Sequence, residues 1–434
     1  MATDTRSELD RGGGVVRDVV ISSGNRNFHL LFSAAEMARR NRLALLICGG
    51  YPTPLEQKLL KSPKIPGAAK LSRLLGRKEE IPDDLIKQNR LSEAISVAGI
   101  SLRGVPRAKF ADIALQKKAF EIYGRHAARH LPKAERVGAR IYHYRAGFGQ
   151  SSVKVAADAG MMTICDHSIV HPALLDVLVA NGGRFPEVRP PRPDGIWGVI
   201  QDDLERADLV LVNSDFVAET FAFMGFDQSR IAVIYQGVED KFLTRLPAQR
   251  EYYTQASTRP VRFLFAGGIG SRKGVDEIAA VLSAVPDAKI ELHVAGSLSA
   301  SARQKYAGLL SDPRVIYHGI LPQGELAKLM SCSDVFIFPS RAEGSARVVF
   351  EAMAAGCAVI TTKNAGSALR DEEGGRIIAV SDVEALSMAI DNVLLDPCGF
   401  AELGQANATL IREHFTQRRY GDQLEIVYQR ARSG

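Results

Sequence analysis

The sequence predicts an α/β protein built from two doubly wound, Rossmann-like domains that face a cleft. Three observations support this fold class. The chain has 434 residues, which is more than one hydrophobic core usually organises. Short β-branched runs alternate with amphipathic stretches, as in parallel sheets covered by helices. This alternation occurs in two series, separated by a polar stretch at 237–260 in which no strand or long helix can be identified.

Each series predicts its own set of strands, and the second is independent of the first. The first half predicts strands at 15–21, 43–48, 140–144, 162–165, 209–213 and 231–235. The second half predicts strands at 261–266, 289–295, 315–317, 335–339 and 358–361. Ligands of such sheets bind where the carboxyl ends of the strands meet, so the functional residues are expected there.

Composition indicates a globular cytoplasmic protein. Apolar residues make up 46% of the chain and charged residues 24%. The first residues, MATDTRSELDRGGG, contain no apolar core of a signal peptide, and no run of 18 apolar residues predicts a spanning helix. The five cysteines are widely spaced and form no CxxC pair, which favours reduced thiols: Cys48, Cys165, Cys332, Cys357 and Cys398.

The segment 334–361 carries the clearest chemical signal. It reads as a buried strand, a turn with Glu343 and Gly344, and a helix that ends at Gly356. Glu351, two turns into that helix, can accept hydrogen bonds from a ribose diol, while Glu343 can reach hydroxyls of a sugar. Three backbone N–H groups are expected to be unpaired at the helix N-terminus, where they suit a diphosphate: those of Ser345, Ala346 and Arg347.

This segment resembles the retaining family-4 glycosyltransferases of the GT-B type, whose signature is two Glu separated by seven residues. Here those residues are Glu343 and Glu351, and the match continues through EAMAAG. The resemblance implies an acceptor-side domain at 1–240 and a nucleotide-sugar domain at 241–412. It also implies a C-terminal helix at 413–434 that packs back on the first domain.

Two further elements of the second half fit the same resemblance. The stretch 263–276, FLFAGGIGSRKGVD, joins a strand to a helix through a glycine-rich turn that includes Gly268. Glycines let the backbone approach phosphate, and the resemblance gives Lys273, with Arg272, the task of neutralising the leaving diphosphate. In the third element, 317–322, backbone groups near Ile320 and Leu321 are implied to contact the nucleobase.

The first half contributes weaker signals. Gly24 lies in a turn after the first strand, and the resemblance places that turn opposite the donor. His167 follows another strand at its carboxyl end and fits the family position that contacts the donor sugar. His171 is a second candidate nearby. For both histidines, an ordinary buried side chain is the competing interpretation.

The implied reaction is transfer of a sugar, with retention, from a nucleotide-diphosphate donor to a saccharide or lipid-linked acceptor. Lys273 and the helix amides would stabilise the leaving diphosphate, whose oxygen takes the acceptor proton. No DxD triplet is present, so we expect neither a metal nor a cofactor, the nucleotide sugar being a substrate. The alternatives are an epimerase or hydrolase on the same scaffold and a non-catalytic sugar-nucleotide-binding protein.

Charge is concentrated in one part of the chain. Residues 51–145 contain 20 Lys or Arg against 9 Asp or Glu, and within them the segment 58–78 mixes cations with leucines. Such a mixture can bind the anionic inner face of a membrane, although a solvated basic segment is an equal alternative. No nucleic-acid motif accompanies the charge, so nucleic acid is not an expected partner.

Overall fold

The computed structural model describes residues 17–26, 29–53, 56, 77–102 and 109–433. The chain forms two compact units, Met1–Cys165 and Asp166–Gly434. It contains a seven-stranded sheet in the order β3-β2-β1-β4-β5-β6-β7 and a six-stranded sheet in the order β10-β9-β8-β11-β12-β13. The predicted α/β class with two doubly wound sheets is therefore confirmed. The assignment of 1–240, 241–412 and 413–434 to separate parts stays a prediction.

The first unit is built on four parallel strands, which are β1 (Val19–Ser22), β2 (Leu43–Cys48), β3 (Ile86–Gln88) and β4 (Ile141–Arg145). Strand β5 (Met162–His167) spans the division between the units. The helices of this unit are α1 (Leu30–Arg39), α4 (Arg90–Ser101), α5 (Lys109–Arg136) and α6 (Ser151–Asp158), with the 3-10 helix η1 at Asp83–Leu85. Strands β1 and β2 are almost entirely buried because their residues are aliphatic on both faces.

The second unit contains the complete six-stranded sheet, in which every neighbouring pair is parallel. Its strands are β8 (Val261–Ala266), β9 (Ile290–Ala295), β10 (Val315–Gly319), β11 (Val335–Phe338), β12 (Ala358–Thr362) and β13 (Gly375–Ile378). This unit also holds the paired strands β6 (Leu209–Val212) and β7 (Ile231–Val233).

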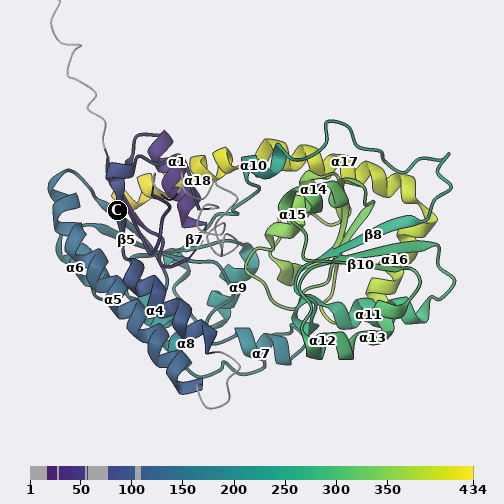
Figure 1. Ribbon diagram of the computed structural model, residues 1–434, viewed down its shortest axis with the longest axis horizontal. Coiled ribbons are helices and arrows are strands. Elements are labelled where there is room, and N and C mark those ends of the chain that lie inside the picture. The colour runs from purple at the N-terminus through teal and green to yellow at the C-terminus, as the bar shows by residue number, and fades with distance from the viewer. Residues whose placement is uncertain (1–16, 27–28, 54–55, 57–76, 103–108, 434) are drawn as a thin grey trace, which may run out of the picture. The chain divides into compact units, whose positions relative to one another are not determined.

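Helices cover both faces of the six-stranded sheet, with α14, α15 and α17 on one side and α11, α12 and α13 on the other (Figure 1). Their bounds are α11 (Val275–Ala284), α12 (Ala300–Lys305), α13 (Ala307–Ser311), α14 (Gln323–Ser331), α15 (Arg347–Ala354), α16 (Val383–Leu395) and α17 (Pro397–His414). The remaining helices of the unit are α7 (Leu175–Ala180), α8 (Gly195–Arg206), α9 (Asp215–Phe223), α10 (Asp240–Leu243) and α18 (Gln417–Ser433). Three 3-10 helices complete it: η3 (Gln228–Arg230), η4 (Ser271–Lys273) and η5 (Lys363–Ala365).

Every predicted strand is present, and two short strands were not predicted. Strand β3 has three residues and β13 has four, and each lies at the edge of its sheet. Most of their residues are half-buried, so neither shows the continuous apolar run of a central strand. No described helix has the length and apolar character needed to cross a membrane.

The core of the second unit opens into a hollow at the carboxyl ends of β8 and β9. Phe265 and Phe338 stack in the core with ring centroids 5.9 Å apart. The strands then end in Ala266-Gly267 and Ala295-Gly296, which carry almost no side-chain volume. A Cβ on Gly296, whose φ is +147°, would lie 1.7 Å from the carbonyl oxygen of Gly267, so this close approach requires glycine.

Candidate active site

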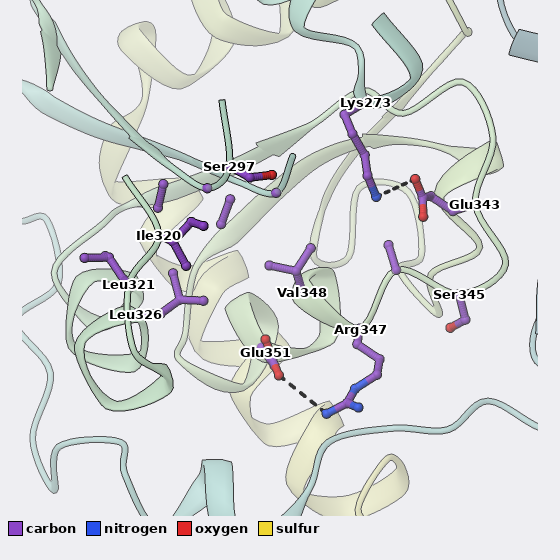
Figure 2. Close-up of a pocket in the computed structure, with 15 residues that line it drawn as sticks. Lys273, Ser297, Ile320, Leu321, Leu326, Glu343, Ser345, Arg347, Val348 and Glu351 are labelled. Carbon is purple, nitrogen blue, oxygen red and sulfur yellow. Dashed lines mark ion pairs between the residues drawn. The ribbon is translucent and has the colours of Figure 1, made fainter. Parts of the chain in front are cut away.

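A pocket of about 580 Å³ lies at the carboxyl ends of these strands and at the N-terminus of α15 (Figure 2). Its floor is the small-residue end of β8 and β9, and its walls come from η4, the loop before α14, and the turn and first helical turns of 343–351. The lining residues are Ala266, Gly267, Lys273, Ala295, Gly296, Ser297, Ile320, Leu321, Leu326, Glu343, Ser345, Ala346, Arg347, Val348 and Glu351. The location agrees with the rule that open α/β sheets bind ligands at their strand carboxyl ends.

Two cations share one carboxylate oxygen at one side of this pocket. Lys273 Nζ and Arg272 Nη1 each lie 2.5 Å from Glu343 Oε1, and the hydroxyl of Ser340 donates to the same oxygen at 3.1 Å. Lys273 also lies over the ring of Phe338, 4.9 Å from its centroid. Figure 2 shows the Lys273–Glu343 pair facing the pocket. The Glu343 carboxylate is therefore the counter-ion of both cations.

The charge of Lys273 depends on this partner. Burial lowers the pKa of Lys273, and the negative charge of Glu343 opposes that decrease, while Arg272 adds to it. The Lys273 side chain is 17% exposed and that of Glu343 is 13% exposed. An ammonium group in such a partly dry site interacts more strongly with an anion than one on the open surface.

The turn that carries the cations is fixed to the turn that carries Glu343. Arg341 donates to Glu277 Oε1 at 2.7 Å and to Asp276 Oδ2 at 3.0 Å, both at the start of α11. Its backbone N–H donates to the carbonyl of Arg272 at 2.9 Å. A Cβ on Gly274, whose φ is +77°, would lie 2.1 Å from the carbonyl oxygen of Pro339. These contacts set the positions of Lys273 and Glu343 before any ligand binds.

The N-terminus of α15 lines the pocket, and the prediction that the N–H of Ala346 is unpaired there is wrong. The N–H of Ala346 donates to the carbonyl of Ala365 at 2.9 Å, because the η5 turn lies against it. Among the described residues, no acceptor pairs with the N–H of Ser345 or of Val348. These two donors and the positive end of the helix dipole favour an anion.

Glu351 lines the same pocket from the second turn of α15. Burial raises the pKa of Glu351 to about 7, and the neighbouring charge of Glu239 adds to the increase. Arg347 and a hydrogen bond from Gln323 act in the opposite direction, and Arg347 Nη2 lies 3.9 Å from Glu351 Oε1. The Glu351 side chain is only 13% exposed. It is a hydrogen-bonding group in the dry part of the site.

The remaining side of the pocket is apolar. Ile320, which is 77% exposed, and Leu321 follow β10, and Leu326 belongs to α14. Ser297 follows the glycine at the end of β9, and the hydroxyl of Tyr317 donates to the carbonyl of Gly296 at 3.0 Å. An apolar wall with backbone polar groups at its edge suits a planar heterocycle.

The structure brings eight of the predicted site residues into the pocket lining: Lys273, Glu343, Ser345, Ala346, Arg347, Glu351, Ile320 and Leu321. Arg272 lies just behind the lining, in contact with Glu343, and Gly268 follows the lining residue Gly267. Gly344 is packed tightly, because a Cβ there would lie 2.0 Å from the carbonyl oxygen of Ser168. Its role is thus to let the turn approach that loop closely.

His167, His171 and Gly24 lie outside the lining. The buried His167 Nε2 is 3.1 Å from the carbonyl oxygen of Val170, and its ring meets the Phe221 ring at 5.7 Å. His171 is also buried, and burial lowers its pKa to about 4, so its ring is neutral at pH 7. Gly24, in the first unit, has a φ of +77° and donates its N–H to the hydroxyl of Tyr123 at 3.0 Å.

Sequence reasoning did not identify several residues of the site. Ser297, Leu326 and Val348 line the pocket, as do the small residues of its floor. The signal for Ser297 was available, since Gly296-Ser297 directly follows a predicted strand. Among the described residues, no group of three or more His, Cys, Asp or Glu side chains is arranged to hold a metal ion.

Comparisons with known proteins agree with this geometry. Residues 260–396 match the protein family described as Glycosyl transferases group 1. The chain is 26% identical over 235 residues to the GDP-mannose-dependent alpha-(1-6)-phosphatidylinositol monomannoside mannosyltransferase of Mycolicibacterium smegmatis. That match covers 50% of this chain and 61% of the relative. The chain therefore spans less than two thirds of this curated relative's length.

Solved structures show the same fold. Sucrose-phosphate synthase from Thermosynechococcus elongatus superimposes with a TM-score of 0.63 at 18% identity, covering 96% of this chain and 100% of that one. Anabaena HepE, solved with UDP and glucose, gives 0.58 at 15% identity, covering 95% and 99%. Residues 260–396 therefore match the model of the Glycosyl transferases group 1 family, and the chain has the two-sheet GT-B fold.

Proposed function

We propose that this protein is a retaining hexosyltransferase that moves a sugar from a nucleotide-diphosphate donor to a saccharide or lipid-linked acceptor. The observation that carries the proposal is the arrangement of the pocket. One cavity of about 580 Å³ is lined by Lys273, by the backbone of Ser345 and Val348, by a buried carboxyl group and by an apolar wall, and Arg272 meets Lys273 at Glu343. A diphosphate, a ribose and a base require groups of these kinds within reach of one another.

The diphosphate is the leaving group of the reaction, and the cations bind it. Lys273 Nζ and Arg272 Nη1 meet at Glu343 Oε1, so a diphosphate that enters there replaces the carboxylate oxygen as their anion. The N–H groups of Ser345 and Val348 add neutral donors. As the glycosidic bond breaks, negative charge grows on the diphosphate, and a single preorganised donor of this kind contributes about 3 kcal/mol to the transition state.

Glu343 positions the sugar, because its carboxylate becomes available once its two cations pair with the diphosphate. Once its cations bind phosphate, Glu343 can accept hydrogen bonds from sugar hydroxyls, with His167 as the predicted second contact. The acceptor hydroxyl attacks from the face that the diphosphate leaves, and a diphosphate oxygen takes its proton. This route retains the anomeric configuration, and it needs no metal because fixed cations supply the positive charge.

The relatives support the class of donor and acceptor. The mycobacterial relative is named for GDP-mannose and for a phosphatidylinositol mannoside, and Anabaena HepE was solved with UDP and glucose. These names favour a nucleoside diphosphate donor and are compatible with a lipid-linked acceptor. We therefore propose a role in cell-surface polysaccharide or glycolipid synthesis.

The first experiment is a binding screen of UDP, GDP, ADP and their common sugar conjugates by calorimetry or thermal shift, with Glu351→Ala in parallel. We expect saturable binding of one nucleotide family, weakened at least tenfold in the variant. No binding across the panel would contradict the proposal. Donor turnover without any acceptor would instead indicate a hydrolase or epimerase. Donor binding without turnover in any acceptor screen would indicate a non-catalytic sugar-nucleotide-binding protein.

Attachment to the inner face of an anionic membrane is a further part of the proposal. The predicted contact, 58–78, lies outside the described residues except for residues 77 and 78. The seven cations of 58–78 motivate the test. We expect binding to vesicles of anionic lipid to fall when Lys58, Lys61, Lys64 and Lys70 are neutralised together. If that variant binds the vesicles as tightly as the unmodified protein, and with the same dependence on salt, this segment has no role in membrane binding.

A further inference from the structure

Arg347 stands between two carboxyl groups, and it contacts them unequally. Its guanidinium pairs directly with Glu239, the residue before α10, whose side chain is 9% exposed. The same Nη2 is 3.9 Å from Glu351 Oε1, a contact marked in Figure 2. The other oxygen of Glu239 lies 2.8 Å from Lys241 Nζ. Glu239 therefore pairs with two cations, Arg347 and Lys241, whereas Glu351 lies 3.9 Å from one of them, Arg347.

The other neighbour of Glu351 carries no charge. Gln323, at the start of α14, hydrogen-bonds to Glu351, and its own side-chain oxygen accepts from Arg245. The positive charge of Arg245 is thus directed at an amide rather than at Glu351. The charged groups that neighbour Glu351 from α15 and from the segment around α10 are Arg347, Glu239, Lys241 and Arg245.

We propose that Glu239 is a positioning residue that withholds Arg347 from Glu351 and so sets how readily the site binds the ribose of its nucleotide. This inference rests on the proposed function, because it assigns Glu351 to the ribose diol. An ionised carboxylate can accept hydrogen bonds from both hydroxyls of a diol, whereas a protonated carboxyl group has lost part of that capacity.

The direction of the effect follows from the contacts. Removing the charge of Glu239 takes away the carboxylate that competes with Glu351, 3.9 Å away, for Arg347, and it also removes a negative charge that disfavours ionisation of Glu351. Both changes keep Glu351 ionised at lower pH. At pH 6, below its pKa, a tenfold increase in the acidity of Glu351 would raise its ionised fraction about fivefold.

The test is the pH dependence of binding of UDP, GDP and ADP to the full chain carrying Glu239→Gln. We expect the best-bound diphosphate to bind about fivefold more tightly at pH 6 and equally at pH 8.5, where Glu351 is ionised in both proteins. Asp240→Asn is the matched control, since Asp240 is the exposed neighbour and loses the same charge. We expect its pH profile to follow that of the unmodified protein.

A second variant separates the role of Arg347 from the direct effect of the charge. When Glu239→Gln is introduced into an Arg347→Met protein, we expect less than half of the shift in pH profile. An unchanged profile for Glu239→Gln, an equal shift in Asp240→Asn, or a full shift in the Arg347→Met background would each overturn the inference while leaving diphosphate binding intact. Failure of the unmodified protein to bind any diphosphate would overturn the proposed function, and this assignment with it.

Discussion

Replacing Glu351 by Gln should stabilise the nucleotide-free protein at the same time as it weakens the site. The pKa of the Glu351 carboxyl group is about 7 in the folded protein, against an ordinary value of 4.5. At a pH above both values, ionising this group in the folded protein costs more free energy than ionising it in the unfolded chain. The unfolded chain ionises first, so folding becomes less favourable as the pH rises from 4.5 to 7. Gln keeps a similar shape and carries no such cost.

The magnitude follows from the two pKa values. Their difference corresponds to about 3 kcal/mol at pH 8 and to about 1 kcal/mol at pH 5, at about 1.4 kcal/mol per pKa unit. Relaxation around the pocket reduces both figures, so we expect Glu351→Gln to gain between about 1 and 3 kcal/mol at pH 8 and clearly less at pH 5.

Urea unfolding followed by circular dichroism at the two pH values measures this gain. Glu325→Gln, on α14, is the control, because its side chain is 59% exposed and its change should stay within about 0.5 kcal/mol. An equal gain for Glu351→Gln at both pH values would show that packing, not charge, causes it. No gain at pH 8 would refute the assignment of a costly ionisation to Glu351.

Three other perturbations test the site. Lys273→Met should lower kcat about 100-fold, which is the scale of one preorganised donor. Lys289→Met, at an exposed position, is the control and should leave steady-state kinetics unchanged. Similar kinetics for the two variants would exclude Lys273 from the mechanism. Gly344→Ala should lower the free energy of unfolding by about 1–3 kcal/mol, because the added Cβ would meet the carbonyl of Ser168. Gly270→Ala is the control, because a Cβ there meets nothing within 4 Å. Equal shifts in the melting temperatures of the two variants would contradict this packing argument. Treatment with EDTA should leave transfer activity unchanged, and a loss restored by a divalent cation would disprove metal independence.

Local patterns in the sequence were sufficient for most of the fold and half of the site. Strand β8 was predicted at its observed bounds because an apolar run ends at Pro260 on one side and at Gly267 on the other. Glu343 and Glu351 were predicted to share a site, and both line one cavity, since a turn followed by two helical turns brings them together. The edge strands were missed because partly exposed strands lack that apolar signal.

The rest of the site depends on contacts between residues far apart in the chain. The pairing of Ala346 N–H with Ala365, and of Arg347 with Glu239, joins segments separated by 19 and 108 residues, and no local pattern records either. The sharing of Glu343 Oε1 by Arg272 and Lys273 is equally non-local. Sequence identified these residue types, but which partner each one holds is a property of the folded chain.

The oxygen of Glu343 that Arg272 and Lys273 share bears on which anions this pocket retains. Inorganic phosphate and sulfate are common small anions, and two unguarded cations beside helix amides would retain them. Because Glu343 already neutralises one of the two charges, an incoming anion must compete with a carboxylate that is permanently in place. A singly coordinating ion gains little from that exchange, whereas a diphosphate that also offers a ribose and a base repays it through contacts elsewhere in the pocket. We therefore expect Glu343 to favour ligands that have more than one point of attachment.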